Sequence, residues 1–338
     1  MSDIVELNRD VEDYVLQAGH PRSRHSFKQE DARPLTLLHL SDIHANRTAW
    51  ERMVAYANHY QEYIDLVLHT GDYCGGSQKQ YVDMYTVADC ALPLYNCVGN
   101  HDCTTGDWSL ADKALAHRLL FNHTEGWDVT FMDVPHAMSY YKDFPDSRIR
   151  LIVLDDYYHV FETRQWLRAL LAEAREQGLH VITAQHEPTG PIEDTYGALF
   201  QTRDDYRAVF EANELRRKTY AYDHRNRVLY EDILAEHSRL GGILVCNLAG
   251  HDHVDQFGCS PRGVLNVAVQ NATCCHMLGD MRRVPGTRSE DCFNVVSVDT
   301  TLGLLKVVRI GAHVDHYLRS HRAMCFDYRN GCMVTEIG

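Results

Sequence analysis

Short apolar runs without polar alternation recur over the first 250 residues, each followed by a polar cluster and then an amphipathic stretch of helical length. The runs are LTLLHL, IDLVLH, LPLYNCV, LIVL, HVITAQ and GILVCNLA, starting at residues 35, 64, 92, 151, 180 and 242. Such runs predict strands buried on both faces, and the amphipathic stretches at 46–62, 78–91 and 161–177 predict crossover helices. The pattern therefore indicates an α/β layered fold.

Beyond His253 the runs become shorter and are separated by turn-length polar segments, as in VLNVAVQ, FNVVSV and LLKVVRI. We expect these strands to form a second, largely antiparallel sheet that completes a sandwich. Residues 1–34 are polar and mixed in charge, which predicts an N-terminal extension with a helix near 4–17. Residues 35–338 are expected to form a single domain. Its polar, Tyr-rich stretch at about 187–239 is long for a loop, which predicts a cap over a binding cleft.

Composition indicates which partners the protein can bind and which compartment it occupies. Hydrophobic residues make up 45% and charged residues 24%, as in soluble globular proteins. The formal net charge of −14 opposes binding to nucleic acid and to anionic lipid, so neither a nucleic-acid nor a membrane partner is expected. No protein partner is evident. The eleven cysteines include no CxxC pair, and no export signal is seen, which predicts reduced thiols in the cytoplasm. For the adjacent Cys274 and Cys275, both a redox pair and two buried thiols are open.

Histidine and acidic side chains stand where the predicted strands end. Asp42 and His44 are two residues apart, as are His251 and His253, and in an extended chain such side chains point the same way. Ligands of open α/β sheets collect at the carboxyl ends of strands.

Three more polar residues, Asp72, Asn100 and His186, each stand alone at the end of a different strand. A set of carboxylate, imidazole and amide ligands without thiolate favours Mn, Fe or Zn over Ca or Mg. The sequence therefore predicts a transition-metal site at the strand ends.

The motifs DIH (42–44), GD (71–72), GNHD (99–102), the isolated His186 and GHDH (250–253) follow one another in this order. Together they resemble the signature of the calcineurin-like metallophosphoesterases, over about residues 36–255. The resemblance implies a four-layer α/β/β/α sandwich, with two mixed sheets flanked by helices. In the second motif, GDYCGGS lacks the second Asp and the Arg of the protein Ser/Thr phosphatase branch, and Gly75 stands where purple acid phosphatases have a Tyr ligand. The motifs look most like those of bacterial phosphodiesterases and small-molecule phosphatases.

The resemblance also implies a role for each site residue. Asp42, His44 and His253 would hold one divalent transition metal ion, Asn100, His186 and His251 the other, and Asp72 would bridge them. His101 would contact the phosphate and protonate the leaving oxygen. The implied reaction is hydrolysis of a small or medium-sized phosphomonoester or phosphodiester, by attack of metal-bound hydroxide on phosphorus.

Two other functions stay open on the sequence alone. A metallo-nuclease of the same fold is disfavoured by the acidic charge and by the lack of a basic stripe. A non-catalytic binding or scaffold protein is disfavoured because all seven ligand positions are intact, although fold alone does not determine function. For Asp155 and Asp156 a carboxylate that orients a ligand histidine and a turn cap are both open. Asp102 and Asp252 are expected to support neighbouring ligands or cap turns.

Overall fold

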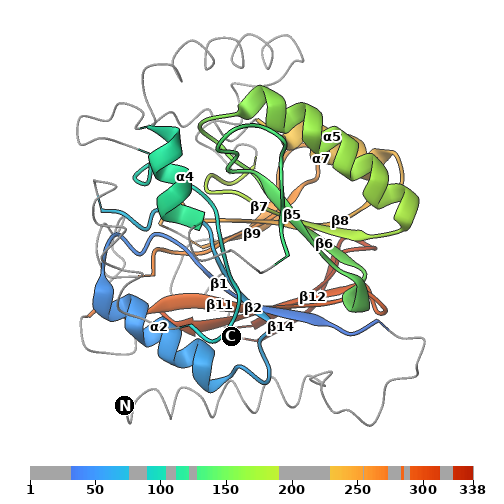
Figure 1. Cartoon of the computed structure of the whole chain (residues 1–338). Helices are drawn as coiled ribbons and strands as arrows, with labels where there is room; N and C mark the ends of the chain where they lie inside the picture. The colour runs from blue at the N-terminus through green and yellow to red at the C-terminus, as the bar shows by residue number, and fades with distance from the viewer. Residues whose placement is uncertain are drawn as a thin grey trace.

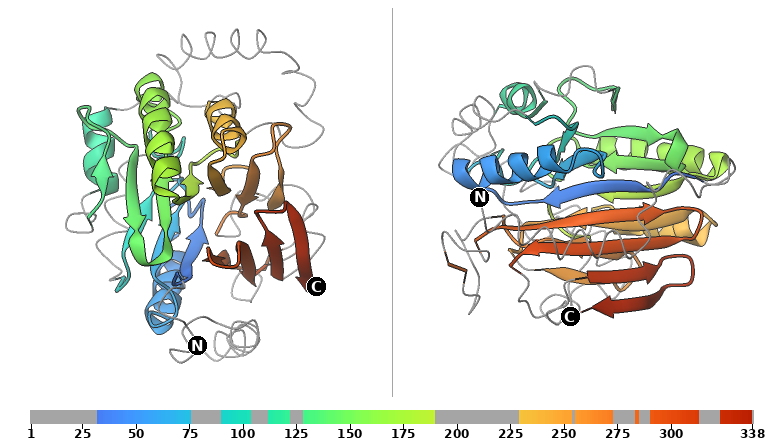
Figure 2. Two further views of the ribbon diagram at one scale, coloured as in Figure 1. Left: turned by 90° about the vertical axis from the view of Figure 1, so that its right-hand side faces the viewer. Right: turned by 90° about the horizontal axis from the view of Figure 1, so that it is seen from below.

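Two seven-stranded sheets pack face to face, with helices on both outer sides (Figures 1 and 2). The computed structural model describes residues 32–75, 90–103, 112–121, 128–189, 229–253, 255–272, 283–284, 290–312 and 323–337. The helix expected near 4–17 and the Cys274/Cys275 pair lie outside these residues. Of the helix expected at 78–91, only residues 90 and 91 are described, and they are not helical. The predicted α/β fold with two mixed sheets flanked by helices is confirmed.

The first sheet has the order β14-β13-β12-β11-β1-β2-β3. Its strands are β1 (Leu35–Leu40), β2 (Leu66–His69), β3 (Leu94–Asn96), β11 (Cys292–Asp299), β12 (Leu304–Gly311), β13 (Ala323–Asp327) and β14 (Cys332–Ile337). Strands β1, β2 and β3 are parallel, and β11 joins β1 antiparallel.

The second sheet has the order β4-β5-β6-β7-β8-β10-β9. Its strands are β4 (Thr130–Phe131), β5 (Tyr140–Phe144), β6 (Ile149–Val153), β7 (His180–Ala184), β8 (Ile243–Ala249), β9 (Gln256–Cys259) and β10 (Leu265–Ala268). Strands β6, β7, β8 and β10 are parallel, whereas β5 and β9 pair antiparallel with their neighbours.

The expectation that the strands after His253 form a sheet of their own was wrong. β9 and β10 extend the second sheet beside β8, while β11 to β14 extend the first sheet beside β1. The reason is a long-range pairing, since Leu35 lies opposite Val298 in an antiparallel register. Each sheet therefore combines parallel strands from the first part of the chain with antiparallel strands at its edge.

Helix α2 (Arg47–His59) covers the outer face of the first sheet. It begins after Asn46, whose Oδ1 accepts a hydrogen bond from the Ala49 N–H at 3.0 Å, as expected of an N-cap asparagine. Its buried residues include Trp50, Met53 and Ala57, which recur at the spacing of one helix face. That face packs into the same core as strand β1.

Helices α5 (Val160–Gln177) and α7 (Glu231–Arg239) cover the outer face of the second sheet. Helix α5 ends at Gly178 with φ +66°, a left-handed C-cap that glycine adopts without steric cost. Because α7 is part of this core, the end of the stretch predicted as a cap belongs to the layered structure. Two further elements, α4 (Lys113–Phe121) and the 3₁₀ turn Pro145–Ser147, complete the described helices.

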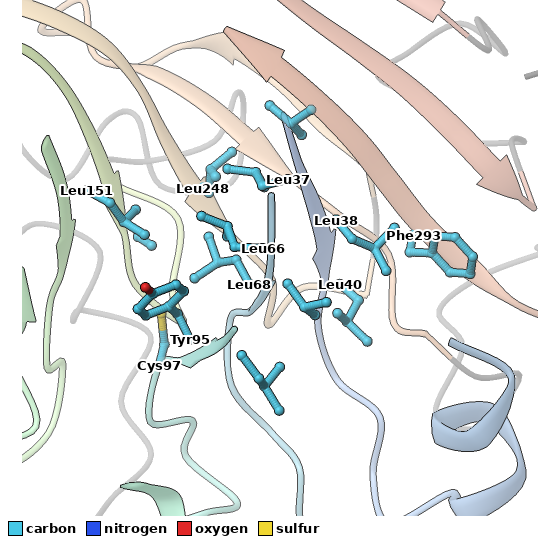
Figure 3. Packing of buried hydrophobic residues seen from close by; sticks show 14 of the residues in the cluster. Leu37, Leu38, Leu40, Leu66, Leu68, Tyr95, Cys97, Leu151, Leu248 and Phe293 are labelled. Atoms are coloured by element: carbon cyan, nitrogen blue, oxygen red, sulfur yellow. The ribbon is translucent and has the colours of Figure 1, made fainter. Parts of the chain in front are cut away.

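The largest apolar cluster fills the space between the sheets and beneath α2. Figure 3 shows Leu37 near Leu248 of the second sheet, whereas Leu38 and Leu40 lie towards Phe293. The Phe293 ring contacts Tyr56 of α2, with 5.0 Å between ring centroids. Strand β1 is thus buried on both faces, as its unbroken apolar run predicted.

A buried ion pair joins the two sheets near the second histidine motif. Arg309 of β12 donates to the carboxylate of Asp255, and neither side chain is more than 1% exposed. Arg309 also donates to Asn294 Oδ1 at 2.8 Å, and Gln270 donates to Asp255 from its backbone N–H at 3.1 Å. The partners satisfy both charges, which a buried pair requires.

The cysteines in the described part of the chain are free thiols, and most of them are buried. None of the described helices combines the length and the apolarity that crossing a bilayer requires.

Candidate metal centre

The seven predicted ligands and His101 lie in turns that follow five strands of the two sheets. Asp42 and His44 follow β1, Asp72 follows β2, Asn100 and His101 follow β3, His186 follows β7, and His251 and His253 follow β8. Their donor atoms form three overlapping groups, within each of which the atoms lie no more than 4.8 Å apart. The groups are Asp42, His44 and His253; His44, Asp72 and His101; and Asp42, Asp72 and His186. The structure thus brings the predicted residues together, and their role as ligands stays a prediction.

Several of these side chains stand at residues with left-handed backbone, so the expectation that Asp42 and His44 share a direction in extended chain was wrong. Asp42 has φ +54° and His44 has φ +47°. His251 and His253 have φ +69° and +57°. Aspartate and histidine tolerate this region better than most residues, and such conformations concentrate at functional sites. Both pairs reach the centre through a tight turn and not through strand alternation.

The motif glycines leave room that a side chain would fill. A Cβ on Gly99 would lie 2.2 Å from Asp72 Oδ1, and a Cβ on Gly250 would lie 1.8 Å from Ser41 Oγ. Gly71 has φ +99°, and a Cβ there would lie 2.6 Å from His186 Nδ1. The glycines preceding Asp72, Asn100 and His251 therefore allow the ligand turns to approach one another.

Position one, as we name the group Asp42, His44 and His253, has its polar atoms pointed at one another. His253 Nε2 lies 3.2 Å from Asp42 Oδ1 and 3.0 Å from His44 Nε2. The other ring nitrogen of His44, Nδ1, lies 3.3 Å from the Cys74 carbonyl oxygen. Since a carbonyl only accepts, the hydrogen-bond network assigns the proton to Nδ1 and the lone pair to Nε2. His44 thus presents a ligand nitrogen to the group.

Position two, the group Asn100, His186 and His251, is arranged in the same way. His186 Nε2 lies 3.0 Å from Asn100 Oδ1 and 3.2 Å from His251 Nδ1. His251 Nδ1 lies 3.1 Å from the same Asn100 oxygen. His186 Nδ1 donates to the Thr70 carbonyl oxygen at 2.7 Å, which fixes the ring and directs Nε2 at its partners.

Asp72 lies between the two positions. Its Oδ2 is 3.4 Å from His186 Nε2 and 3.8 Å from His101 Nε2. Its Oδ1 accepts the backbone N–H of His101 at 2.8 Å, so the turn after β3 is tied to the turn after β2. The His101 ring meets the His44 ring edge to face, with 4.9 Å between centroids. Asp72 is thus placed to contact both positions, and His101 borders the centre.

A family model for the calcineurin-like phosphoesterases matches residues 35–255, which include the whole cluster. The chain belongs to this family. Membership makes it a metal-dependent phosphoric ester hydrolase, and the order of motifs predicted from the sequence is that of the family. No curated protein has a sequence that matches the chain.

Solved structures with a related fold include three proteins of low sequence identity. A dimetal phosphatase from Danio rerio has 13% identity and a TM-score of 0.49, over 83% of this chain and 97% of that chain. An uncharacterised protein of Streptococcus pneumoniae, titled a predicted phosphoesterase, has 12% identity and a TM-score of 0.34, over 84% and 93%. GAP50, titled the anchor in the inner membrane complex of Plasmodium, has 11% identity and a TM-score of 0.46, over 84% and 86%. None of the three assigns a substrate to this chain.

The charges at this cluster favour the binding of cations. Burial alone would raise the pKa of Asp42, but the His253, His186 and His44 rings hold it well below its usual range. Burial opposes ionisation of Asp72 in the same way, and His186 again lowers the pKa below the usual value. Two buried carboxylates are thus ionised, and unpaired charge is costly in buried surroundings.

The histidines respond to the same charges in two ways. Burial lowers the pKa of His44 to about 4, so this ring is neutral at physiological pH and free to act as a ligand. Burial alone would lower the pKa of His186 as well, but Asp72 and Asp42 hold it well above its usual range.

The buried Asp42 Oδ1 meets no hydrogen-bond donor in favourable geometry among the described residues. A buried group of carboxylate oxygens and imidazole nitrogens fits divalent metal ions well.

Several supporting residues act through the backbone, and periodicity gives no signal for them. The Asp102 carboxylate accepts the N–H groups of Asp72 and Gly99 at 2.9 Å and of Cys74 at 3.0 Å, so it holds two ligand turns together. Burial, followed by the nearby Asp72 charge, raises its pKa to about 7. Asp252 accepts a hydrogen bond from Gln256 Nε2 at 2.7 Å. This supporting role of Asp102 agrees with the expectation from the sequence.

Proposed function

We propose that the chain hydrolyses a small or medium-sized phosphomonoester or phosphodiester at a dinuclear centre. The observation that carries this proposal is the convergence of Asp42, Asp72 and His186, all buried, with their neighbours at the ends of strands from both sheets. Position one would hold one divalent transition metal ion, position two the other, and Asp72 would contact both. When bound, two such ions lower the pKa of water and neutralise charge on the phosphate oxygens.

The protein's own groups would then position the ions, the ester and one proton. The Thr70 carbonyl oxygen and the Cys74 carbonyl oxygen set the tautomers of His186 and His44, so that each turns its Nε2 to the centre. His101 would contact the phosphate and give its Nε2 proton to the leaving oxygen. General acid catalysis of this kind helps most when the leaving group is a poor one.

Three further proposals concern the segments around the catalytic domain and the compartment of the protein. We propose that residues 190–228, which lie outside the described residues, cap the cleft and contribute to substrate choice. We also propose an N-terminal extension at residues 1–34, of which the described Ala32 is already buried against the catalytic domain. The free, largely buried thiols support a reducing, cytoplasmic compartment.

The test is an activity panel run together with metal analysis. Purified protein is stripped with a chelator, reloaded with Mn²⁺, Fe²⁺ or Zn²⁺, and given p-nitrophenyl phosphate and bis(p-nitrophenyl) phosphate. We expect hydrolysis to vanish on stripping and to return with about two equivalents of a transition metal. Undiminished hydrolysis by protein shown to be free of metal would contradict the proposal. The ratio of the two rates decides between monoester and diester preference.

A further inference from the structure

Two neighbouring carboxylates after β6, Asp155 and Asp156, serve different parts of the molecule. Both residues are fully buried. They follow strand β6, which pairs parallel with β7, and β7 ends two residues before His186. The sequence left a turn cap and an orienting role open for both, and the hydrogen bonds separate the two residues.

Asp155 holds the turn that leads into helix α5. Its Oδ1 accepts the N–H of Tyr157 at 2.8 Å and of Tyr158 at 3.0 Å. Its Oδ2 accepts the N–H of His159 at 3.0 Å, and His159 is the residue before the first turn of α5. All three donors lie within four residues of Asp155, so this carboxylate acts as a local cap.

Asp156 reaches across to the next strand. Its Oδ2 accepts the N–H of His186 at 3.1 Å and of Glu187 at 3.0 Å, about thirty residues away in the chain. Charge-assisted hydrogen bonds of this kind are roughly twice as strong as neutral ones. Since the His186 ring donates to the Thr70 carbonyl oxygen, His186 is held at two points, its backbone by Asp156 and its ring by Thr70.

We propose that Asp156 is a positioning residue for position two, acting through the backbone of His186. The inference rests on the proposed function, because it assumes that His186 is a metal ligand. Without the Asp156 acceptor, two N–H groups at the turn after β7 lose their partner in a buried place, and the turn relaxes. The His186 Nε2 then no longer stays within 3.0 Å of Asn100 Oδ1, and the second metal ion is bound less tightly.

Asp155 provides the matched control, since it is adjacent and equally buried, and within the described part of the chain its carboxylate accepts N–H groups of its own turn. We compare Asp156→Ala, Asp156→Asn and Asp155→Ala by titrating the stripped protein with Mn²⁺ in a calorimeter, and by thermal unfolding. Support around a metal ligand typically contributes 10- to 100-fold in affinity, so Asp156→Ala should bind the second equivalent about 10- to 100-fold more weakly. The first equivalent should bind as in the unmodified chain.

Asp156→Asn keeps an oxygen that accepts the same two N–H groups, and it should restore most of the affinity for the second equivalent. Asp155→Ala should lower the unfolding temperature and leave both affinities unchanged. If Asp156→Ala folds poorly, Asp156→Glu retains the charge but displaces the acceptor by one methylene, and it should also weaken the second equivalent.

The proposal is overturned if the Asp156 variants that fold bind both equivalents as Asp155→Ala does. An unmodified chain that binds no second Mn²⁺ would instead contradict the proposed function. The two failures are therefore distinguishable in the same titration.

Discussion

Position one and position two present similar donor atoms but are built in different ways. In position one Asp42, His44 and His253 all have a positive φ. In position two only His251 does, while His186 is held by hydrogen bonds to its ring and to its backbone. Position one therefore depends on strained turns that their surroundings must enforce, and position two depends on a hydrogen-bonded scaffold.

The two constructions should fail in different ways. A strained turn persists only while the neighbouring atoms determine it, so it is sensitive to any change of volume beside it. A hydrogen-bonded turn is sensitive to the loss of an acceptor and tolerates a substitution that preserves one. Asp72 belongs to neither construction alone, because it lies between the two positions.

The largest effect is expected for Asp72→Ala, which removes the carboxylate shared by the two positions. Both positions should therefore be damaged together. Metal ions contribute several kcal/mol to such reactions and about 1.4 kcal/mol is a factor of ten, so turnover should fall at least about a thousandfold. Metal analysis of the purified variant should show loss at both positions. Asp133→Ala, at an exposed site, is the control. A variant that keeps two metals and near-normal turnover would disprove the bridging role.

Gly250→Ala should damage position one more than position two, and Gly71→Ala should do the reverse. The new methyl group would meet Ser41 and Asp42 in the first case, and His186 and the Gly99 backbone in the second. Overpacking of this kind costs about 1–3 kcal/mol, so each variant should bind one Mn²⁺ equivalent roughly 10- to 100-fold more weakly. Calorimetric titration measures both equivalents. Gly258→Ala, where the methyl group meets open space, should change neither. Equal losses of both equivalents in each variant would contradict the comparison.

His101→Ala should affect the reaction and spare both metal positions. Loss of a general acid typically lowers the rate about 10²- to 10⁴-fold. We expect this decrease with alkyl phosphate esters and a much smaller one with p-nitrophenyl esters, whose leaving group needs no proton. Metal content should equal that of the unmodified chain. A uniform decrease over both kinds of ester would assign His101 to phosphate binding alone.

The smallest effect concerns His39, whose Nε2 lies 3.1 Å from Thr70 Oγ1 and so links the strands beneath the two positions. Burial, with a smaller effect from Arg309, lowers its pKa to about 3. The unfolded chain takes up a proton below about pH 6.5 and the folded chain does not, so stability falls as the pH drops from about 6.5 towards 3. His39→Gln should reduce this slope by up to about 1.4 kcal/mol per pH unit. Urea unfolding between pH 7.5 and 4.5 measures how the free energy of unfolding changes with pH. An unchanged slope in His39→Gln would contradict this role of His39.

The buried strands were predictable because a strand covered on both faces needs an unbroken apolar run. LTLLHL became β1 over Leu35–Leu40, and LIVL lies at the end of β6. Which sheet a strand joins was not predictable in this way. The pairing of Leu35 with Val298 depends on packing between distant segments. The hydrophobic pattern along the chain does not predict such a pairing.

The residues of the centre were predictable from their place at strand ends, but the way they are held was not. The left-handed turns at Asp42 and His253 have no periodic signal. The roles of Asp102 and Asp156 are still harder to infer, since a carboxylate that accepts backbone N–H groups from another strand can stand next to any residue type.

Each of the two positions draws its donors from both sheets. Asp42 and His44 come from the first sheet and His253 from the second, while Asn100 comes from the first and His186 from the second. An ion bound there would link the two sheets, and its free energy of binding would add to the stability of the folded chain. The proposed metal centre would then also stabilise the fold. Loss of metal would lower the free energy of unfolding as well as abolish hydrolysis.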